Sequence, residues 1–411
     1  MGKSIRDPIH GFIDVDDDAL KVISSPFFQR LRHIHQTGFA YLVYPGMHHT
    51  RFEHSLGAME LTKDFCQWIK SKISLDFLTE DFIRLAGTIA LLHDVGHMPF
   101  SHTFEDSIYL LKEQMGRSVE FLGKKTHVKY GVKLINEVFS KEIEAIGKKT
   151  HISDTVEFSS RVLQESPKSE EEKFVSVLIS SSMDADRSDY LLRDSYYAGV
   201  GYGNFELDRI KRVLTYIDGK IAIEEKGVPA AEQFLLSRSY MFRTVYFHSV
   251  VAMYNSVASY AMAKLIDRGI IEVPTRISDF LSLDEHLIFS SLKYLGEKFV
   301  RPLVYRQGYK RYKRDVKGEC ARKISARRRE LHQVLAQYDG DVLVSMLMDS
   351  PYYERENEGI YVNVEGKVAQ LSQLSDLSLS LERETAKIVF SYNDGFEKGE
   401  KVIQDILDSY C

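Results

Sequence analysis

The sequence predicts a mainly α-helical protein with one short β-hairpin and a smaller mixed α/β lobe towards its C-terminus. Three observations support this fold class. Apolar residues recur at three- and four-residue spacing through most of the first two-thirds of the chain. An Asp-Gly pair at 218–219 separates two short β-prone segments, as in a tight hairpin. Strand-like segments bounded by turn residues otherwise occur only after about residue 340.

The helices expected before residue 200 follow from this apolar spacing and from helix-start signals. Pro26 suits the first turn of a helix, where its missing N–H costs nothing. The spacing predicts helices over residues 18–25, 26–36, 54–71, 79–92, 127–146 and 174–194. The acidic, serine-containing stretch 165–172 predicts a surface loop, and the glycines of 199–203 mark the end of the last helix.

Beyond residue 200 the character of the chain changes. The hairpin is predicted as strand 213–217, turn 218–219 and strand 220–224, followed by a long helical region over 230–267. After Pro274 the pattern becomes mixed, with helices over 282–297 and 321–338 and strands over 341–348, 359–364 and 387–391. We therefore predict a boundary near residue 270, with one domain over 1–270 and the mixed lobe over 271–411.

Composition narrows the class of protein. Hydrophobic residues make up 44% of the 411 residues and charged residues 27%, which is typical of a globular chain and excludes a disordered one. The longest apolar stretch, 85–92, is far shorter than the roughly 20 residues of a membrane-spanning helix. Residues 1–11 show neither a signal peptide nor a myristoylation signal. The three widely spaced cysteines indicate neither a disulfide framework nor a cysteine zinc site. We expect a cytoplasmic protein with no membrane partner.

The net charge of −5 hides one basic segment. Between residues 301 and 330 there are twelve Lys or Arg and three Asp or Glu, with Tyr305, Tyr309 and Tyr312 interleaved. We call residues 301–329 the basic patch. Two interpretations stay open: a solvated helix face, or a phosphate-binding surface for a nucleotide or nucleic acid.

Histidines gather in one part of the sequence. Six of the 14 lie between residues 48 and 102, and the segment LLHDVGHMPFSH contains His93, Asp94, His97 and His102. If a helix continues to Pro99, His93 and His97 share a face and Gly96 leaves space between them. Because burying several titratable groups without a partner is costly, we predict a divalent cation here. Mixed imidazole and carboxylate ligands suit iron, manganese, zinc or magnesium better than calcium.

Further ligands must come from elsewhere in the chain. His54 lies early in a predicted helix, close to Arg51. Four acids fall within eleven residues of another predicted helix, which is unusual for a simple solvent face: Asp184, Asp186, Asp189 and Asp194. Asp186, Tyr190 and Asp194 are spaced to form one stripe.

These residues resemble a known signature. His54, the pair His93-Asp94 and Asp186 are similar to the H…HD…D signature of the HD-domain phosphohydrolases. Five ordered motifs resemble one branch, the HD-domain deoxynucleoside-triphosphate triphosphohydrolases: DPIHG, FQRLRHIHQTG, YPGMHHTRFEHSLG, HDVGHMPFSH and YFHS. The likeness runs from about residue 3 to residue 313. It implies a helical HD-domain bundle at the N-terminal side of the mixed lobe.

The resemblance also implies an activity. The metal ligands would be His54, His93, Asp94 and Asp186. The reaction would convert a dNTP to a deoxynucleoside and tripolyphosphate, with additional magnesium accompanying the triphosphate. Because the 5′ alkoxide is a poor leaving group, a general acid should accelerate its departure by about 10²–10⁴-fold. The catalytic residues implied are His127 as that acid, Glu105 as its partner where the family has Asp, and His97 and His102 near the α-phosphate.

Substrate and regulatory residues follow by the same resemblance. Arg51 and Arg187 would bind phosphate oxygens, although relatives carry Lys at the second position. The implied sugar and base contacts are Gln36, Tyr190, Asp194 and Tyr246. Lys3, Gln29 and Arg32 match part of an interface nucleotide site, whereas Ser24 replaces its guanine-reading Asp. We therefore predict a homo-oligomer, preferably a tetramer, that responds to dNTP mixtures without strict dependence on GTP.

Two alternatives to the dNTP triphosphohydrolase stay open. The chain could be another HD phosphohydrolase that acts on a nucleoside monophosphate, a cyclic dinucleotide or an alarmone. It could instead be a nucleic-acid-binding protein or nuclease that uses the basic patch, which we favour less.

Overall fold

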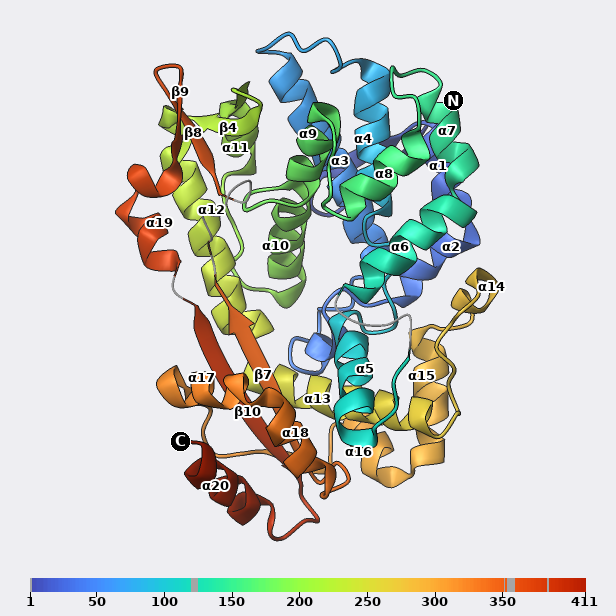
Figure 1. Ribbon diagram of the computed structural model, residues 1–411, viewed down its shortest axis with the longest axis vertical. Helices are drawn as coiled ribbons and strands as arrows, with labels where there is room; N and C mark the ends of the chain where they lie inside the picture. The colour runs from blue at the N-terminus through green and yellow to red at the C-terminus, as the bar shows by residue number, and fades with distance from the viewer. Residues whose placement is uncertain (1, 120–124, 351, 353–358, 383) are drawn as a thin grey trace.

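The structure is a computed structural model that describes residues 2–119, 125–350, 352, 359–382 and 384–411. It confirms the mainly α-helical fold with a mixed C-terminal lobe (Figure 1). The helical body fills the upper and right parts of the view, and the long strands of the lobe run diagonally at lower left. Among the described residues, no helix is both long and apolar enough to cross a membrane.

The chain opens with a hairpin that the sequence analysis did not predict. β1 (Lys3–Asp7) pairs antiparallel with β2 (Gly11–Val15). Asp7 forms the turn, because its Oδ1 accepts hydrogen bonds from the backbone N–H groups of Ile9 (2.8 Å) and His10 (2.9 Å). Local side-chain acceptors of this kind stabilise turns that hydrophobic periodicity does not reveal.

The helical body follows, and its first ten helices are α1 (Asp17–Ser24), α2 (Pro26–Gln29), α3 (Arg51–Lys70), α4 (Glu80–Leu92), α5 (His102–Met115), α6 (Thr126–Glu137), α7 (Ser140–Gly147), α8 (Thr155–Leu163), α9 (Glu170–Ile179) and α10 (Ala185–Ala198). Two 3-10 turns, η1 (Arg30–His33) and η2 (Gly38–Leu42), connect α2 to α3. The predicted helices over 18–25, 54–71 and 79–92 are confirmed apart from their ends.

Several predicted long helices are wrong because the chain breaks within them. The 26–36 helix ends at Gln29, and the 127–146 and 174–194 regions each form two helices. Asp184 is the N-cap of α10 and accepts from the Arg187 N–H at 2.6 Å, so a new helix begins there after α9 has ended at Ile179. The predicted loop 165–172 is shorter than expected, since α9 begins at Glu170 with Ser169 as its cap. Periodicity detects the buried face but not a cap that restarts the helix.

The predicted hairpin is confirmed. β3 (Leu214–Ile217) pairs with β4 (Lys220–Glu224), and both turn residues, Asp218 and Gly219, have positive φ angles as the tight turn requires. α11 (Leu207–Val213) precedes it. β4 also pairs in parallel with β8 (Tyr361–Val364), which pairs with β9 (Lys367–Gln370). The C-terminal segment therefore extends the sheet that the hairpin begins.

The predicted helix over 230–267 is interrupted. After η3 (Glu225–Gly227), α12 (Val228–Met241) passes into a π-helical turn, η4 (Phe242–Tyr246), and α13 (Ser249–Asp267) then starts anew. α13 packs against α5, α16 (Glu297–Tyr305) and β7 (Val342–Asp349), so it joins the body to the lobe.

The lobe combines short helices with a four-stranded sheet. Its β7 and β10 (Thr385–Asn393) are antiparallel, and β5 (Tyr309–Arg311) and β6 (Val316–Lys317) also pair with β10. The remaining elements are α14 (Ile277–Phe280), α15 (Glu285–Ser291), η5 (Leu292–Leu295), α17 (Gly318–Ala326), α18 (Arg328–Ala336), η6 (Leu371–Gln373), α19 (Asp376–Leu381) and α20 (Gly399–Tyr410). The predicted helices over 282–297 and 321–338 are thus each broken, whereas the three predicted strands are confirmed.

The hydrophobic core has two parts. The main cluster of buried apolar residues extends from Ile13 to Leu371 and draws on residues on both sides of position 270. A second cluster, from Tyr312 to Tyr410, lies between the lobe sheet and its helices. The domain boundary near residue 270 stays a prediction.

Two of the three cysteines form a disulfide that their spacing in the sequence did not indicate. Cys320 on α17 and Cys411 at the end of α20 form a disulfide across 91 residues, with their Cα atoms 5.1 Å apart. Cys66 is buried and free. Sequence spacing could not reveal the pair because α17 and α20 meet only after the lobe has folded.

Candidate active site

A cavity of about 450 Å³ opens among α3, α5, α6, α10 and η4. Eleven of the residues singled out from the sequence line it: Gln36, Arg51, His93, Asp94, His97, His102, His127, Asp186, Tyr190, Asp194 and Tyr246. These side chains come from segments up to 210 residues apart in the chain. His54, Glu105 and Arg187 are not among the lining residues.

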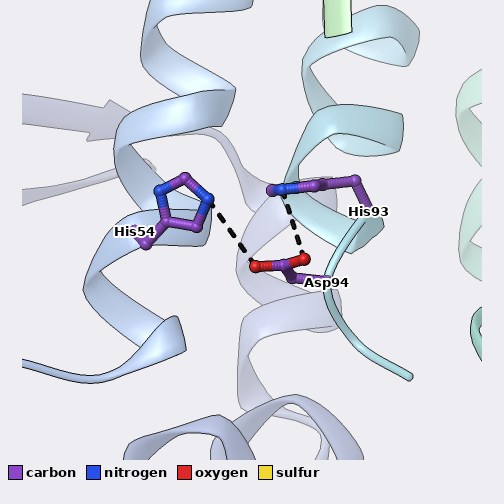
Figure 2. Close-up of side chains that lie close together, drawn as sticks. All are labelled: His54, His93 and Asp94. Atoms are coloured by element: carbon purple, nitrogen blue, oxygen red, sulfur yellow. Dashed lines mark ion pairs between the residues drawn. The ribbon is translucent and has the colours of Figure 1, made fainter. Parts of the chain in front are cut away.

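His54, His93 and Asp94 lie close together, as Figure 2 shows. One ligand atom from each falls within 4.8 Å of the other two. His93 and Asp94 also line the cavity. The Nε2 atom of His54 is 3.6 Å from Asp94, and the Nε2 atom of His93 is 3.4 Å from it. Asp186 joins this group, because its Oδ1 lies 3.0 Å from His54 Nε2 and 3.6 Å from His93 Nε2.

The hydrogen bonds of the Nδ1 atoms determine which nitrogen of His54 and of His93 is left to bind a metal. His54 Nδ1 is 2.7 Å from Asp189, and His93 Nδ1 is 2.7 Å from the Ala90 carbonyl oxygen. Both Nδ1 atoms therefore donate, which leaves each Nε2 as an acceptor facing carboxylate oxygens. These buried Nε2 atoms have no hydrogen-bond partner. A divalent cation between imidazole lone pairs and carboxylates would satisfy every one of these groups, so the donor set fits a metal site.

The charges of these His and Asp side chains favour the binding of a cation. Burial would lower the pKa of His54, but the neighbouring carboxylates of Asp186 and Asp189 outweigh this effect and raise the pKa to about 10. Burial would raise the pKa of Asp94, but the Arg51 guanidinium and the neighbouring imidazoles hold it well below its usual range. The carboxylates therefore stay ionised, and the site attracts either a proton or a metal cation.

The segment that carries His93 and Asp94 is not helical as expected. α4 ends at Leu92, and residues 93–101 form successive turns before α5. Gly96 is needed for a different reason from the one we predicted: a Cβ there would collide with the His127 carbonyl oxygen and the Gly131 nitrogen of α6. This close approach brings the turn segment against the helix that carries His127.

Three histidines and one glutamate form a second cluster on the cavity wall. The rings of His97 and His127 are stacked, 4.2 Å apart, and His102 lies edge-on to both. Glu105 is 2.8 Å from His127 Nδ1 and 3.0 Å from His102 Nδ1. Burial would raise the pKa of Glu105, but these hydrogen bonds hold it well below its usual range. Burial, aided by the charges of Arg51 and His127, holds the pKa of His97 well below its usual range, so His97 is neutral.

The two predicted phosphate-binding arginines differ in their surroundings. Arg51 lines the cavity, forms an ion pair with Asp94 and donates to Ser101 Oγ at 2.7 Å. Arg187 instead forms an ion pair with Asp184 and donates to the Ser181 carbonyl. The structure thus brings Arg51 to the cavity and leaves Arg187 outside its lining.

Aromatic and polar residues close another wall. Tyr190 and Tyr246 have ring centroids 6.2 Å apart, and the Tyr246 hydroxyl donates to Asp194 at 2.7 Å. His49 Nε2 lies 2.6 Å from the other Asp194 oxygen. Tyr246 is the last residue of the π-helical turn η4, a distortion that is frequent at functional sites. Gln36 lines this cavity, and its buried Oε1 has no hydrogen-bond partner.

The residues proposed for regulation lie away from the cavity. Lys3 is exposed on β1, and Gln29 ends α2. Arg32 donates to Gln29 at 2.8 Å and stacks over the Phe52 ring at 3.5 Å. Ser24 is exposed and donates to the Leu20 carbonyl within its own helix.

The basic patch does not present all three of its tyrosines on the surface, as the sequence suggested. Tyr309 and Tyr312 are buried in the core, and their hydroxyls bind Gly340 and Gln404, so they do not interleave with surface charges. Tyr305 is 62% exposed. Arg328 and Arg329 form ion pairs with Asp106 and Glu113 of α5.

Sequence reasoning missed several residues of the site. Asp189 was noted only as one of four acids, yet it is fully buried and binds His54, His10 and Arg193. Its spacing of three from Asp186 was the available signal, because both residues then face α3. His49 and Ser101 gave no signal of their own, since their partners come from distant segments.

Comparisons with known proteins agree with this geometry. A family model described as HD domain matches residues 51–189, and one described as HD associated region matches residues 205–405. The chain is 30% identical over 291 residues to the deoxynucleoside triphosphate triphosphohydrolase SAMHD1 homolog of Dictyostelium discoideum, covering 69% of this chain and 51% of that protein. It spans between 51% and 64% of the length of three curated relatives that it matches.

Solved structures match along almost the whole chain. A hypothetical protein from Aquifex aeolicus is 31% identical, with a TM-score of 0.76 and coverage of 99% of this chain and 100% of that one. A phosphohydrolase from Bacteroides thetaiotaomicron is 26% identical, with a TM-score of 0.74 and coverage of 96% and 100%. The HD model includes the segments that carry His54, His93, Asp94 and Asp186. The chain therefore belongs to the HD-domain phosphohydrolase family, with an HD-associated region following its HD domain.

Proposed function

We propose that this protein is a metal-dependent dNTP triphosphohydrolase that converts a dNTP to a deoxynucleoside and tripolyphosphate. The main support is that three groups of side chains open onto one cavity: the His and Asp metal ligands, the histidine cluster and the tyrosine wall. The similarity to a triphosphohydrolase homolog from Dictyostelium supports the same substrate class.

The proposed metal ligands are His54, His93, Asp94 and Asp186. A divalent cation held there would polarise the phosphoryl group under attack and activate a water molecule. The ligands alone do not select among iron, manganese, zinc and magnesium, because all four accept imidazole and carboxylate. Additional magnesium accompanying the triphosphate would offset the charge of the substrate.

The proposed proton donor is His127. Glu105 accepts a hydrogen bond from His127 Nδ1, so it orients the ring. The opposite nitrogen, Nε2, can then deliver a proton to the departing 5′ oxygen. His97, neutral and stacked on His127, keeps the ring in place and leaves His127 as the acid of the pair.

The proposed sugar site is the wall formed by Tyr190 and Tyr246. Because Asp194 binds both the Tyr246 hydroxyl and His49, the tyrosine is held in one orientation. A rigid aromatic wall of this kind excludes an extra hydroxyl by shape, whereas Asp194 and Gln36 offer acceptors to the groups of a deoxyribose.

Product analysis tests the proposal. Metal-loaded protein is incubated with each dNTP alone and in mixtures, and products are separated by ion chromatography. We expect deoxynucleoside and tripolyphosphate in equal amounts. Pyrophosphate or monophosphate as the product would contradict the proposal and favour another HD phosphohydrolase. Asp186→Ala is the control for contaminating activity.

One observation favours that second candidate. Arg51 is the one Lys or Arg among the described residues that line the cavity, so a substrate with fewer phosphates would also be accommodated. The assay therefore includes a nucleoside monophosphate and a cyclic dinucleotide.

We further propose a homo-oligomer in which Lys3, Gln29 and Arg32 bind an activating nucleotide. The molecular mass of the protein in solution is the measurement that tests the oligomer.

A further inference from the structure

Glu285 is a buried acid that lies outside the cavity but contacts the segments that form it. It is the first residue of α15, within the HD-associated region, and only 4% of its surface is exposed. Its carboxylate reaches residues 250 and 185 positions earlier in the chain.

The carboxylate binds two backbone N–H groups with one oxygen. Oε1 accepts from His35 at 2.7 Å and from Phe100 at 3.1 Å. Oε2 is in close contact with the Nδ1 atom of His35. Glu285 therefore joins the segment after η1 to the turn before α5, which no other described carboxylate does.

Both segments carry groups of the proposed site. The residue after His35 is Gln36, which lines the cavity. Phe100 and Ser101 lie in the left-handed region, each with φ of 57°, and directly precede His102. Non-glycine residues hold such a conformation only where surrounding contacts enforce it. The bond from the Phe100 N–H to Glu285 is one such contact.

The linkage continues from these segments to the metal ligands. Ser101 Oγ donates to the His35 carbonyl at 3.0 Å and accepts from Arg51 Nε at 2.7 Å. Arg51 in turn forms an ion pair with Asp94. Hydrogen bonds and one ion pair between buried or partly buried groups thus connect Glu285 to Asp94, with the backbone of residue 35 and of residues 100–101 as the covalent links.

A neighbouring residue, Arg30, also links the start of α15 to the turn 97–100. The buried Arg30 donates to the Leu283 carbonyl, two residues before Glu285, and to the His97 carbonyl at 2.8 Å. The segment that begins α15 is therefore bound to both ends of the turn 97–100.

We propose that Glu285 is a positioning residue: its Oε1 atom fixes the backbone of the 35–36 and 100–101 segments and so aligns Arg51 and His102 for hydrolysis in the cavity. The inference rests on a hydrolytic site in this cavity. It does not depend on which nucleotide is the substrate.

The test compares substitutions at Glu285 with a matched control. Glu285→Ala removes the acceptor, whereas Glu285→Gln keeps an Oε1 oxygen for both backbone N–H groups. Glu172 is the control, because it is also a buried glutamate (2% exposed), accepts from a backbone N–H and pairs with Arg161, yet its hydrogen bonds reach neither segment that Glu285 joins. Glu172→Ala reproduces the loss of a buried carboxylate elsewhere.

Two measurements are made on full-length, metal-loaded protein of verified metal content. The first is kcat and KM on the phosphoester that the wild type hydrolyses. The second is hydrogen exchange of the peptides covering 35–37 and 97–103, followed by mass spectrometry. For Glu285→Ala we expect kcat to fall by about 10–100-fold with little change in KM, and faster exchange in both peptides. Glu285→Gln should stay within about threefold of wild-type kcat.

Three kinetic results would overturn the proposal. They are a kcat for Glu285→Ala within threefold of wild type, an equal loss in Glu172→Ala, or no recovery in Glu285→Gln. The exchange measurement needs no substrate, so it decides the role of Glu285 even if the wild type hydrolyses no dNTP. In that case the proposed function fails independently, and unchanged exchange in Glu285→Ala would refute the positioning role as well.

Discussion

Replacing Asp189 by asparagine tests whether this buried carboxylate prepares His54 to bind a metal. Each Asp189 oxygen accepts two hydrogen bonds. Oδ1 accepts from His10 and Arg193, and Oδ2 accepts from His54 and Arg193, all between 2.7 and 2.9 Å. An asparagine keeps one acceptor oxygen, but its NH₂ group must face two donors. Either His54 or His10 then loses its partner.

Asp189→Asn should weaken both the free energy of metal binding and the free energy of folding. Removing a carboxylate that orients a metal-binding histidine typically weakens metal affinity by about 10–100-fold, or roughly 1.4–2.8 kcal/mol. Removing one partner of a buried ion pair costs about 3–5 kcal/mol of folding stability. Because Arg193 keeps Asp7 at 2.8 Å, we expect the lower end, about 3 kcal/mol.

Asp7→Asn is the matched control. It removes the other carboxylate bound to Arg193 but does not touch His54. The assay combines urea unfolding with metal dissociation constants measured by chelator competition. Both variants should be destabilised, whereas only Asp189→Asn should bind metal more weakly.

The reasoning would be refuted if the two variants bound metal equally well. In that case Asp189 would serve only the ion pair with Arg193, and the tautomer of His54 would be fixed by the metal itself.

Four further predictions concern the same cavity. Asp186→Ala should lose bound metal and hydrolysis while its circular dichroism stays helical; stoichiometric metal in this variant would exclude Asp186 as a ligand. His127→Ala should lower turnover by about 10²–10⁴-fold at normal metal content, and turnover within a few-fold of wild type would assign the proton to another group. Its partner gives a pH test: because the folded-state pKa of Glu105 is depressed, its carboxylate stabilises the fold above the unfolded pKa of about 4.3 and loses this contribution as pH falls. The difference in unfolding free energy between wild type and Glu105→Gln should therefore shrink between pH 6 and pH 3, and a constant difference would contradict it. Finally, Tyr190 and Tyr246 should favour dATP over ATP by about 10–200-fold, and equal rates would refute the sugar wall.

Local chemistry made part of the fold predictable. The β3–β4 hairpin follows from Asp218-Gly219, because both residues adopt the positive φ angles that few other pairs accept. α4 was predicted from its apolar spacing, and in the structure Thr79 caps its first turn. The predictions failed where a helix stops inside an apolar region, as after Ile179 and at Phe247, because periodicity continues across a break.

The histidine segment shows the same limit at the site. Its composition indicated a metal site, but its conformation did not follow from the sequence. We expected a helix through His97, whereas the turn after Leu92 is set by the contact of Gly96 with α6. Only the packed structure brings His97 onto the ring of His127.

By itself, the sequence determined which residue types were available: imidazoles and carboxylates at spacings that fit a metal, and a basic segment in the C-terminal lobe. Tertiary structure alone decided which of them meet. Asp189 turns the His54 lone pair towards Asp94 and Asp186, Arg187 pairs with Asp184 beside the cavity, and Tyr309 and Tyr312 enter the core. The physical reason is that local patterns fix a residue's helix face or turn, whereas its partners depend on how distant segments pack.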